Sequence, residues 1–268
     1  MTYERRLLAS DMDGTVIPLD EEPERKEEVA ELRAALEREE SLILAYVTGR
    51  DFALARKGIR EHDLPAPDLL VCDVGTSLFH RTSGGFEVDE GYASRMEEAL
   101  GGVDMPQIRE KLEGISGLHL QPGERQSDFK VSYYLDPDAD HGEIVRRTGE
   151  SLEEVGGEVQ IIHSIRARDG TGLLDLLPAG VAKDYAIRYL HDHTGVDEDR
   201  LVYAGDSGND LAAMLSGFKV VVVGNAPEGL KEELKRKGRE RDILSSLYFA
   251  RHPFARGVLE GCRHFGIL

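Results

Sequence analysis

Short runs of consecutive apolar residues recur along this chain, and helix-length segments separate them. The runs do not alternate apolar with polar residues, as a strand with one solvated face would. They suit strands that are buried on both faces of a parallel sheet, with the intervening helices covering it. We therefore expect a doubly wound, Rossmann-like α/β core with a mostly parallel sheet. Strands are expected at residues 7–10, 42–47, 69–72, 201–204 and 219–223, and helices at 24–40, 51–60, 183–193, 211–215, 227–237 and 254–265.

The middle of the chain has a different pattern. Two short apolar segments, 78–80 and 86–88, flank a Ser-Gly-Gly sequence that is typical of a hairpin turn. This mixture predicts an α+β subdomain over residues 81–178, inserted into a core formed by residues 1–80 and 179–268. Within the insert, strands are expected at 129–135, 159–165 and 173–177, and helices at 93–100, 107–113 and 142–153.

Composition limits the classes of protein to which this chain can belong. Among 268 residues, 51 are acidic and 33 are Lys or Arg, which gives a formal net charge of −18. This balance disfavours nucleic-acid binding, which depends mostly on clustered Lys and Arg. The longest apolar runs are too short to span a bilayer, and the N-terminal segment lacks the apolar centre of a signal peptide. We expect a soluble, cytoplasmic protein without nucleic-acid or membrane partners, in which Cys72 and Cys262 are small core residues.

An acidic motif, Asp11-Met12-Asp13-Gly14-Thr15, directly follows the first predicted strand. In an extended backbone, side chains two residues apart point to the same side, so both carboxylates can face one small volume. Ligands of open α/β sheets bind beyond the carboxyl ends of the strands. The alternative is an ordinary turn, since Asp-Gly is a common turn pair. The motif alone leaves both interpretations open.

A second acidic segment, Gly205-Asp206-Ser207-Gly208-Asn209-Asp210, follows the strand expected at 201–204. Alone, it could be a loop with a helix cap. Carboxylates that lie close together repel each other unless a cation holds them. Hard oxygen donors with spare positions for water and phosphate oxygens match Mg²⁺ better than Zn²⁺. The two acidic segments together therefore predict a Mg²⁺ site at one edge of the sheet.

Two further segments have the chemistry to contact an anion. Thr48 and Gly49 end the strand expected at 42–47 and offer a hydroxyl and a backbone N–H at a helix N-terminus, where the dipole favours negative charge. Lys183 opens the helix expected at 183–193, a position that opposes the helix dipole unless an anion or a carboxylate lies nearby. Each segment is also common in structural roles, as a strand exit or as a solvated lysine.

In chain order, these segments resemble the four motifs of the haloacid dehalogenase-like phosphohydrolases: Asp-x-Asp-Gly-Thr, Thr-Gly-Arg, a single lysine, and Gly-Asp-x-x-Asn-Asp. The position of the insert, after the third strand, resembles the α/β-capped branch of that superfamily. Residues 129–134, 174–178, 205–210 and 224–226, with the closing helix, carry a closer resemblance to the sucrose-phosphate phosphatase family. Residues 166–172 are longer and more basic than that pattern, which leaves the identity of the sugar open.

The resemblance implies a phosphatase that works through an aspartyl-phosphate intermediate. Asp11 would be the nucleophile, and Asp13 would protonate the leaving sugar oxygen and then activate a water molecule. Mg²⁺ would be held by Asp11, Asp206 and the backbone carbonyl of Asp13, with Asp210 in support through water or an outer-shell bond.

The same resemblance implies how phosphate and sugar are held. Thr48, Lys183 and the amide of Gly49 would neutralise the transferring phosphoryl group, so Thr48 and Lys183 count among the catalytic residues. The insert would act as a cap that closes over the site and determines which sugar is bound. The substrate-binding residues would be Thr48, Gly49, Arg50, Lys130 and Asn209.

Three residues of the insert are singled out as well. His163 lies on an apolar strand, and we expect it to be a buried, hydrogen-bonded side chain rather than a catalyst. Arg166 and Arg168 alternate on a strand-like stretch, where they could meet a second anionic group such as the carboxylate of a phosphoglycerate ester.

The expected function is Mg²⁺-dependent hydrolysis of a small phosphorylated sugar, sucrose-6-phosphate or a related glycosyl phosphate. Alternatives among enzymes are a broad-specificity hexose-phosphate phosphatase, a glycosyl-glycerate phosphatase and a phosphomutase. Outside enzymes, receiver-type signalling modules also bind phosphate with an acidic cluster, a threonine and a lysine. An inactive remnant that evolution fused to a sugar-phosphate-making partner is a further alternative. The oligomeric state stays open.

Overall fold

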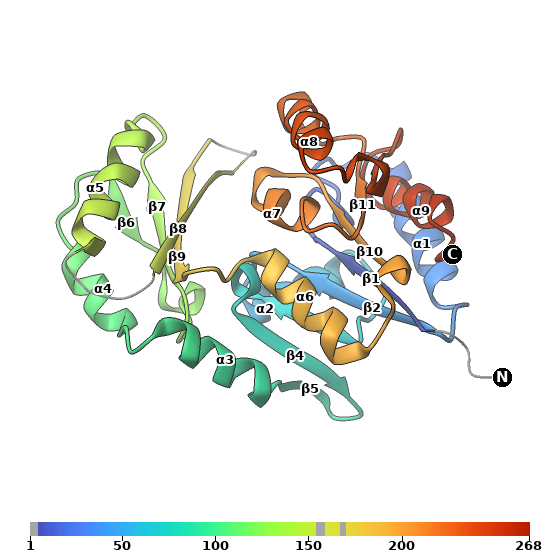
Figure 1. Ribbon diagram of the computed structural model, residues 1–268, viewed down its shortest axis with the longest axis horizontal. Helices are drawn as coiled ribbons and strands as arrows, with labels where there is room; N and C mark the ends of the chain where they lie inside the picture. Colours follow the sequence, from blue (N-terminus) through green and yellow to red (C-terminus); the bar gives the residue numbers. More distant parts are fainter. Residues whose placement is uncertain (1–4, 154–158, 167–169) are drawn as a thin grey trace. The chain divides into compact units, whose positions relative to one another are not determined.

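The computed structural model describes residues 5–153, 159–166 and 170–268 (Figure 1). Arg168, one of the two arginines expected to meet a second anionic group, lies outside the described residues. Helices and strands alternate at both ends of the chain, and an α+β segment lies between them in the sequence.

The chain forms two compact units. Unit 1 contains the residues up to Glu87 and those from Lys183 onward, and unit 2 is Val88–Ala182. The division suggested by the sequence, after residue 80, falls within β4 (Ser77–Thr82). This strand pairs with β3 and therefore belongs to the sheet of unit 1.

Unit 1 is built on an eight-stranded sheet with the order β12-β11-β10-β1-β2-β3-β4-β5. The strands from β12 to β3 are parallel, and β4 runs antiparallel to β3. The strand order reverses between β1 and β10, and ligands of open α/β sheets bind at such a point. The other strands of this sheet are β1 (Arg6–Ser10), β2 (Leu42–Val47), β3 (Leu69–Cys72), β5 (Gly85–Val88), β10 (Leu201–Gly205), β11 (Lys219–Val222) and β12 (Leu247–Phe249).

Both faces of this sheet are covered. Leu7 and Leu8 point to opposite faces of β1, and both are fully buried. On one face, Leu32 of α1 and Val258 of α9 share a core cluster with Leu8, while Cys72 and Cys262 are buried as predicted. The helices of unit 1 are α1 (Glu24–Leu36), α2 (Phe52–Glu61), α6 (Lys183–Thr194), α7 (Leu211–Met214), α8 (Glu228–Glu240) and α9 (Phe254–His264).

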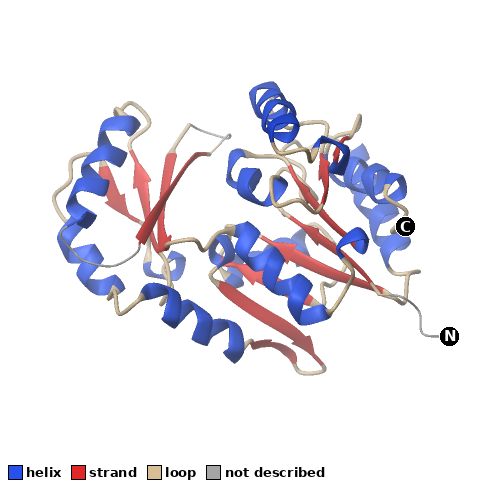
Figure 2. Cartoon of the chain, in the orientation of Figure 1, coloured by secondary structure: helices blue, strands red, loops and turns tan. Residues whose placement is uncertain are grey.

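Unit 2 is an α+β structure with an antiparallel sheet in the order β6-β7-β9-β8. Helices α4 and α5 lie along one side of these strands (Figure 2). On that side, Val131 and Leu174 of the sheet share an apolar cluster with Ile108 of α4 and Ile144 of α5. The elements are α3 (Glu90–Leu100), α4 (Met105–Leu112), β6 (Leu118–Leu120), β7 (Val131–Leu135), α5 (His141–Glu153), β8 (Val159–Ile165) and β9 (Gly172–Pro178).

The prediction that His163 is buried is wrong. Its side chain is exposed, although it does have a hydrogen-bonding partner, His141. The reason is the position of β8 at the edge of its sheet. An edge strand has a neighbour on one side only, so an apolar sequence there does not ensure burial.

The close contact of α9 with β11 generates a stability prediction. A Cβ added at Gly261 of α9 would lie 2.2 Å from Cγ2 of Val221. Alanine normally stabilises a helix interior over glycine by about 0.5–1 kcal/mol. Here steric overlap reverses the sign, and we expect Gly261→Ala to lower the free energy of unfolding by roughly 1–3 kcal/mol. Urea denaturation followed by circular dichroism measures this change.

Gly229 of α8 is the matched control for that substitution. An added Cβ there would meet nothing within 4 Å, so Gly229→Ala should be neutral or stabilising by up to about 1 kcal/mol. Stabilisation by both substitutions would show that α9 has room against β11 and would contradict the packing described.

Candidate active site

The carboxyl ends of β1 and β10 lie side by side where the strand order reverses. Ser10 of β1 is in register with Ala204 of β10, and the amide of Asp11 donates to the Ala204 carbonyl at 2.9 Å. This pairing places the loop after β1 next to the loop after β10. One carboxylate oxygen from each of Asp11, Asp206 and Asp210 lies within 4.8 Å of the other two. The structure thus brings the two acidic segments of the sequence into one small volume.

Lys183 is the first residue of α6 and is completely buried. Its Nζ lies 2.8 Å from Oδ1 of Asp11 and 2.7 Å from Oδ1 of Asp210. It also donates to Oδ1 of Asn209 at 3.2 Å. Burial alone would lower the pKa of this amine, but the two carboxylates outweigh burial and raise it above its ordinary value. Lys183 therefore stays charged and joins the two acidic loops.

Asp210 is fully buried, and both of its carboxylate oxygens accept hydrogen bonds. Oδ1 accepts from Lys183 and from the Tyr203 hydroxyl at 2.6 Å, and Oδ2 accepts from the amides of Asp206 and Ser207 at 3.1 and 3.0 Å. Burial would raise the pKa of Asp210, but Lys183 and these hydrogen bonds lower it. Asp210 is therefore ionised and saturated with donors, which suits a supporting position rather than direct contact with a metal ion.

The carboxyl groups of Asp206 and Asp11 resist ionisation, because both are buried among other carboxylates. The hydroxyl of Thr15 donates to Oδ1 of Asp206 at 2.9 Å, but burial and the charge of Asp210 raise the pKa of Asp206 to about 7. Burial is also the main cause that raises the pKa of Asp11, although Lys183 opposes it. A cation bound between the two groups would favour the ionised form of both. Their hard oxygen donors fit Mg²⁺.

Asp13 has a different environment from Asp11. Its two carboxylate oxygens pair with Nε and Nη2 of Arg50 at 2.7 and 2.6 Å. The side chain of Asp13 is 44% exposed, whereas that of Asp11 is 5% exposed. Burial would lower the pKa of Arg50, but the pairing with Asp13 raises it overall. One carboxylate of the motif is thus shielded and the other is accessible, so that the two can have different roles.

A strained turn after β3, η1 (Asp73–Gly75), holds the loop with Thr48 and Gly49. The amide of Val74 donates to the Thr48 carbonyl at 3.1 Å, and the amide of Asp73 donates to the Arg50 carbonyl at 2.9 Å. Asp73 and Val74 have positive φ angles, of 55° and 61°. A positive φ is rare for a β-branched residue such as Val74. Strain of this kind concentrates at functional sites. Sequence reasoning missed this turn, because nothing in the residue types signals a positive φ at a valine.

Asn225 is a second residue that sequence reasoning did not assign. Its Nδ2 donates to the Gly14 carbonyl at 2.8 Å, and its Oδ1 accepts from the Phe254 amide at 3.0 Å. It therefore ties the loop after β1 to the start of α9. The available signal was an amide side chain soon after a buried strand, in the Gly-Asn-Ala segment that follows β11.

Lys130, the residue expected to contact the sugar, belongs to unit 2 and is 3% exposed. Burial raises the pKa of Asp175, although Lys130 and Ser132 lower it, and the Ser132 hydroxyl donates to Asp175 at 2.5 Å. The guanidinium of Arg166 lies over the Tyr134 ring, 5.7 Å from its centroid. Lys130, Ser132 and Asp175 thus form a largely buried polar cluster in unit 2.

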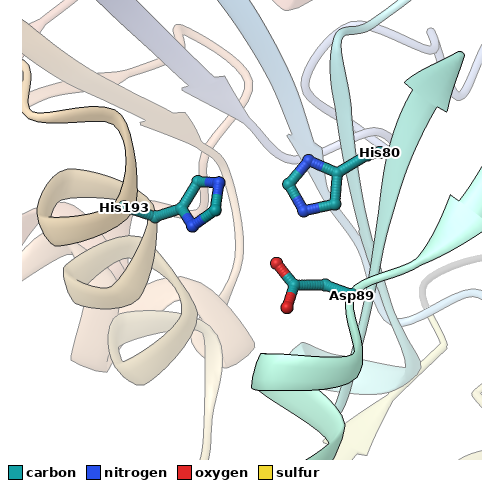
Figure 3. Close-up of side chains that lie close together, drawn as sticks. All are labelled: His80, Asp89 and His193. Carbon is teal, nitrogen blue, oxygen red and sulfur yellow. The ribbon is translucent and has the colours of Figure 1, made fainter.

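A pair of histidines in unit 1 lies away from the acidic cluster. His193, near the end of α6, has its ring centroid 5.0 Å from that of His80 on β4 (Figure 3). Because Lys183 begins α6, the helix places His193 roughly 15 Å from it. Asp89, also drawn in Figure 3, caps α3 by accepting from the Tyr92 amide at 2.8 Å. None of these side chains contributes to the acidic cluster.

Comparison with known proteins identifies the family. A family model described as sucrose-6F-phosphate phosphohydrolase matches residues 4–266. The chain belongs to this family. A HAD-like hydrolase of Nitrosococcus oceani is 34% identical over 97% of this chain and 71% of its own length. Mannosylfructose-phosphate phosphatase of Agrobacterium fabrum is 31% identical over 98% of this chain and 97% of its own length.

A solved structure extends the similarity to the whole fold. The sucrose-phosphatase from Synechocystis sp. PCC6803, in complex with sucrose and phosphate, matches with a TM-score of 0.80 at 28% identity and covers 98% of both chains. The predicted haloacid dehalogenase-like fold class and the predicted sugar-phosphate phosphatase are confirmed. Membership of the sucrose-6F-phosphate phosphohydrolase family also favours an enzyme over the receiver-type alternative.

The two contacts of Asn225 generate a prediction for catalysis. Asn225→Ala removes the tie to the Gly14 carbonyl, so the loop that carries Asp11 and Asp13 becomes less well positioned. We expect kcat to fall about tenfold, which corresponds to about 1.4 kcal/mol of barrier, with little change in KM. Steady-state phosphate release measures both constants.

Asn225→Asp is a second variant, because it keeps an acceptor for the Phe254 amide and replaces the donor to Gly14 by a charged oxygen that repels the Gly14 carbonyl. It should lose at least as much kcat as the alanine variant, because both variants lack the hydrogen bond to Gly14. Full kcat in both variants would contradict a positioning role for Asn225.

Proposed function

We propose that this chain hydrolyses the phosphate monoester of a glycosyl sugar, such as sucrose-6-phosphate, in a Mg²⁺-dependent reaction through an aspartyl phosphate. The observation that carries the proposal is the buried contact of Lys183 with Asp11 and Asp210, beside Asp206. It puts a carboxylate nucleophile, hard oxygen ligands and a fixed positive charge in one volume, as phosphoryl transfer requires. The similarity to a mannosylfructose-phosphate phosphatase and a sucrose-phosphatase supports a disaccharide phosphate as substrate.

Asp11 and Asp13 would divide the covalent chemistry. An Asp11 carboxylate oxygen forms a bond to phosphorus while the bond from phosphorus to the sugar oxygen breaks, and Asp13 gives that oxygen a proton. Asp13 then takes a proton from the water molecule that hydrolyses the aspartyl phosphate. The exposure of Asp13 supports this role, because the group that exchanges protons with sugar and water has to reach both. Arg50 orients the Asp13 carboxylate through two hydrogen bonds.

The acidic cluster has the donors to hold Mg²⁺. Asp11, Asp206 and the backbone carbonyl of Asp13 would be its protein ligands, and Asp210 would support them. The raised pKa values of Asp11 and Asp206 support this assignment, because carboxyls that resist ionisation in the protein alone gain from a cation. When bound, Mg²⁺ offsets the repulsion between an anionic nucleophile and an anionic phosphoester.

The remaining groups would hold the phosphoryl oxygens. Thr48 supplies a hydroxyl, and Gly49 supplies an amide at the N-terminal side of α2. Lys183 supplies a positive charge from the start of α6. The Oδ1 atom of Asn209 accepts from Lys183 and from the Ser207 hydroxyl. The Nδ2 group of Asn209 would therefore be the part of this side chain that donates to a phosphoryl oxygen. Lys130 would bind sugar hydroxyls from unit 2.

No helix in the part of the chain that the structure describes has the length and apolar character to cross a membrane. We propose a cytoplasmic enzyme that acts on a small phosphorylated sugar without nucleic-acid or membrane partners. The two buried thiols, Cys72 and Cys262, support a reducing compartment.

A phosphate-release screen with Mg²⁺ tests the proposed function. We expect kcat/KM to be highest for a disaccharide phosphate, compared with hexose phosphates and glycosyl-glycerate phosphates. A preference for glycosyl-glycerate phosphates would point to Arg166 and its neighbours as the anion contact. Preference for plain hexose phosphates would contradict both assignments, and isomerised sugar without free phosphate would indicate a phosphomutase.

Asp11→Asn serves as the control within this screen, because it removes a charge with little change of shape. It should lower phosphate release more than a thousandfold, which corresponds to about 4 kcal/mol of barrier. Asp63→Asn changes an exposed aspartate far from the cluster in the sequence and should leave the rate unchanged. Activity of Asp11→Asn above a thousandth of wild type would contradict the nucleophile role.

Mg²⁺ affinity should fall as the pH drops below about 7. Because the pKa of Asp206 is raised to about 7, protons compete with Mg²⁺ below that pH, and the association constant should fall about tenfold per unit. Above the ordinary aspartate pKa, the unfolded chain has already released the proton that the folded protein retains. The metal-free protein should therefore lose stability as the pH rises toward 7, and Mg²⁺ should restore it.

Isothermal titration calorimetry between pH 5.5 and 8, with thermal unfolding in parallel, measures both effects. An association constant that stays level across this range would remove Asp206 from the set of metal ligands.

A further inference from the structure

Two histidine side chains of unit 2 face each other at the edge of its sheet. His163 lies on β8, and His141 is the first residue of α5. Nε2 of His163 and Nδ1 of His141 are 3.3 Å apart, and the two rings are nearly perpendicular, at 81°. The phosphatase chemistry uses neither ring.

The backbone orients the His141 ring. Its Nε2 lies 2.9 Å from the carbonyl oxygen of Asp136. Because a carbonyl only accepts hydrogen bonds, this contact places the proton of the neutral ring on Nε2. Nδ1 then carries a lone pair, and Nδ1 is the atom that faces His163. Histidines that bind metals commonly have their second nitrogen held by a carbonyl or a carboxylate in this way.

Gly172 of β9 leaves the space that the His141 ring occupies. A Cβ added at Gly172 would lie 2.7 Å from Cε1 of His141, so any side chain there would displace the ring. The strand pairing places Gly172 opposite Ile165 of β8, two residues from His163. The His141 ring is therefore held by the carbonyl of Asp136 and by Gly172, and the pairing of β8 with β9 fixes the backbone that carries His163.

The separation of the two nitrogens matches metal ligation. Two nitrogens bound to one tetrahedral Zn²⁺ ion are about 3.3–3.4 Å apart, whereas an N–H hydrogen bond is typically about 2.9–3.0 Å long. Partial desolvation of the His163 ring, and repulsion from His141 whenever that ring is protonated, lower the pKa of His163, which favours the neutral form that binds metals. We propose that His141 and His163 bind a divalent transition-metal ion, Zn²⁺ or Cu²⁺, through Nδ1 and Nε2, with water completing the coordination.

This ion would differ from the one in the acidic cluster in both chemistry and effect. Imidazole nitrogens favour Zn²⁺ and Cu²⁺, whereas the carboxylates of unit 1 favour Mg²⁺. An ion held by His141 and His163 would join the start of α5 to the edge strand β8. It would therefore stabilise unit 2 without entering the phosphoryl-transfer reaction.

Copper titration of the whole protein in excess Mg²⁺ tests the proposal. Electron paramagnetic resonance distinguishes imidazole nitrogen from carboxylate oxygen around Cu²⁺, so binding to the acidic cluster is recognised separately. Because His80 and His193 of unit 1 form a second imidazole pair, the titration uses a His193→Gln background, in which we expect one Cu²⁺ with coupling to two nitrogens. His163→Gln and His141→Gln should each weaken its binding at least tenfold. His119→Gln is the matched control, because His119 is an exposed histidine on β6 of the same unit and should change affinity less than twofold.

Two further measurements keep the result interpretable. Zn²⁺ should raise the unfolding temperature of the wild-type protein more than that of His163→Gln, and both proteins should release phosphate at the same rate. A spectrum with oxygen ligands only, or nitrogen coupling that survives both glutamine substitutions, would overturn the proposal and leave the histidines as a hydrogen-bonded pair. None of these outcomes depends on which sugar phosphate the enzyme hydrolyses.

Discussion

The buried charge of Lys183 is the constraint on which the rest of the site depends. A fully buried ammonium is tolerable only with close partners, and Asp11 and Asp210 provide them from the ends of two different strands. The same ion pairs therefore hold the loop after β1, the loop after β10 and the start of α6 in one arrangement. Removing the amine would leave two buried carboxylates beside Asp206, and breaking a buried pair in this way typically costs about 3–5 kcal/mol.

Asp210 spreads that constraint over the second loop. Its donors are a lysine, a tyrosine hydroxyl, a serine hydroxyl and two backbone amides, so the position of the carboxylate determines the path of the backbone around it. On the other side, Asn225 ties the Gly14 carbonyl to the start of α9. The nucleophile candidate thus lies between two anchors. Because phosphoryl transfer depends on positioning and charge, such anchoring matters as much as the reacting groups themselves.

The part of this arrangement that a sequence can predict is the part determined by sheet geometry. Apolar runs predicted the parallel strands, and parallel strands end at one edge, so Asp11 and Asp206 had to approach each other once β1 and β10 became neighbours. The position of Lys183 at the start of a helix indicated a nearby anion or carboxylate, but the sequence did not identify Asp11 and Asp210 as its two partners. Asp13 shows the same limit, since nothing in the motif predicts its pairing with Arg50.

Other features were unpredictable because neighbours, rather than local sequence, create them. Strands β6 and β12 have three residues each, too few for a pattern, and exist because longer strands pair with them. The positive φ angles at Asp73 and Val74 arise from the hydrogen bonds to the Thr48 loop. His163 lies on an apolar strand, yet the edge position of that strand leaves it exposed.

Sugar selection has to come from residues outside the acidic cluster, because the cluster contacts only the phosphoryl group in the proposed reaction. Along β7, Val131 belongs to the apolar cluster of unit 2, so Ser132 points to the other face of the sheet. There Ser132 and Asp175 share a hydrogen bond close to the buried charge of Lys130. An apolar core would have folded without this costly group. If Lys130 binds sugar hydroxyls as proposed, this group is where the sugar would meet unit 2, and differences among sugars would be decided on this face of its sheet.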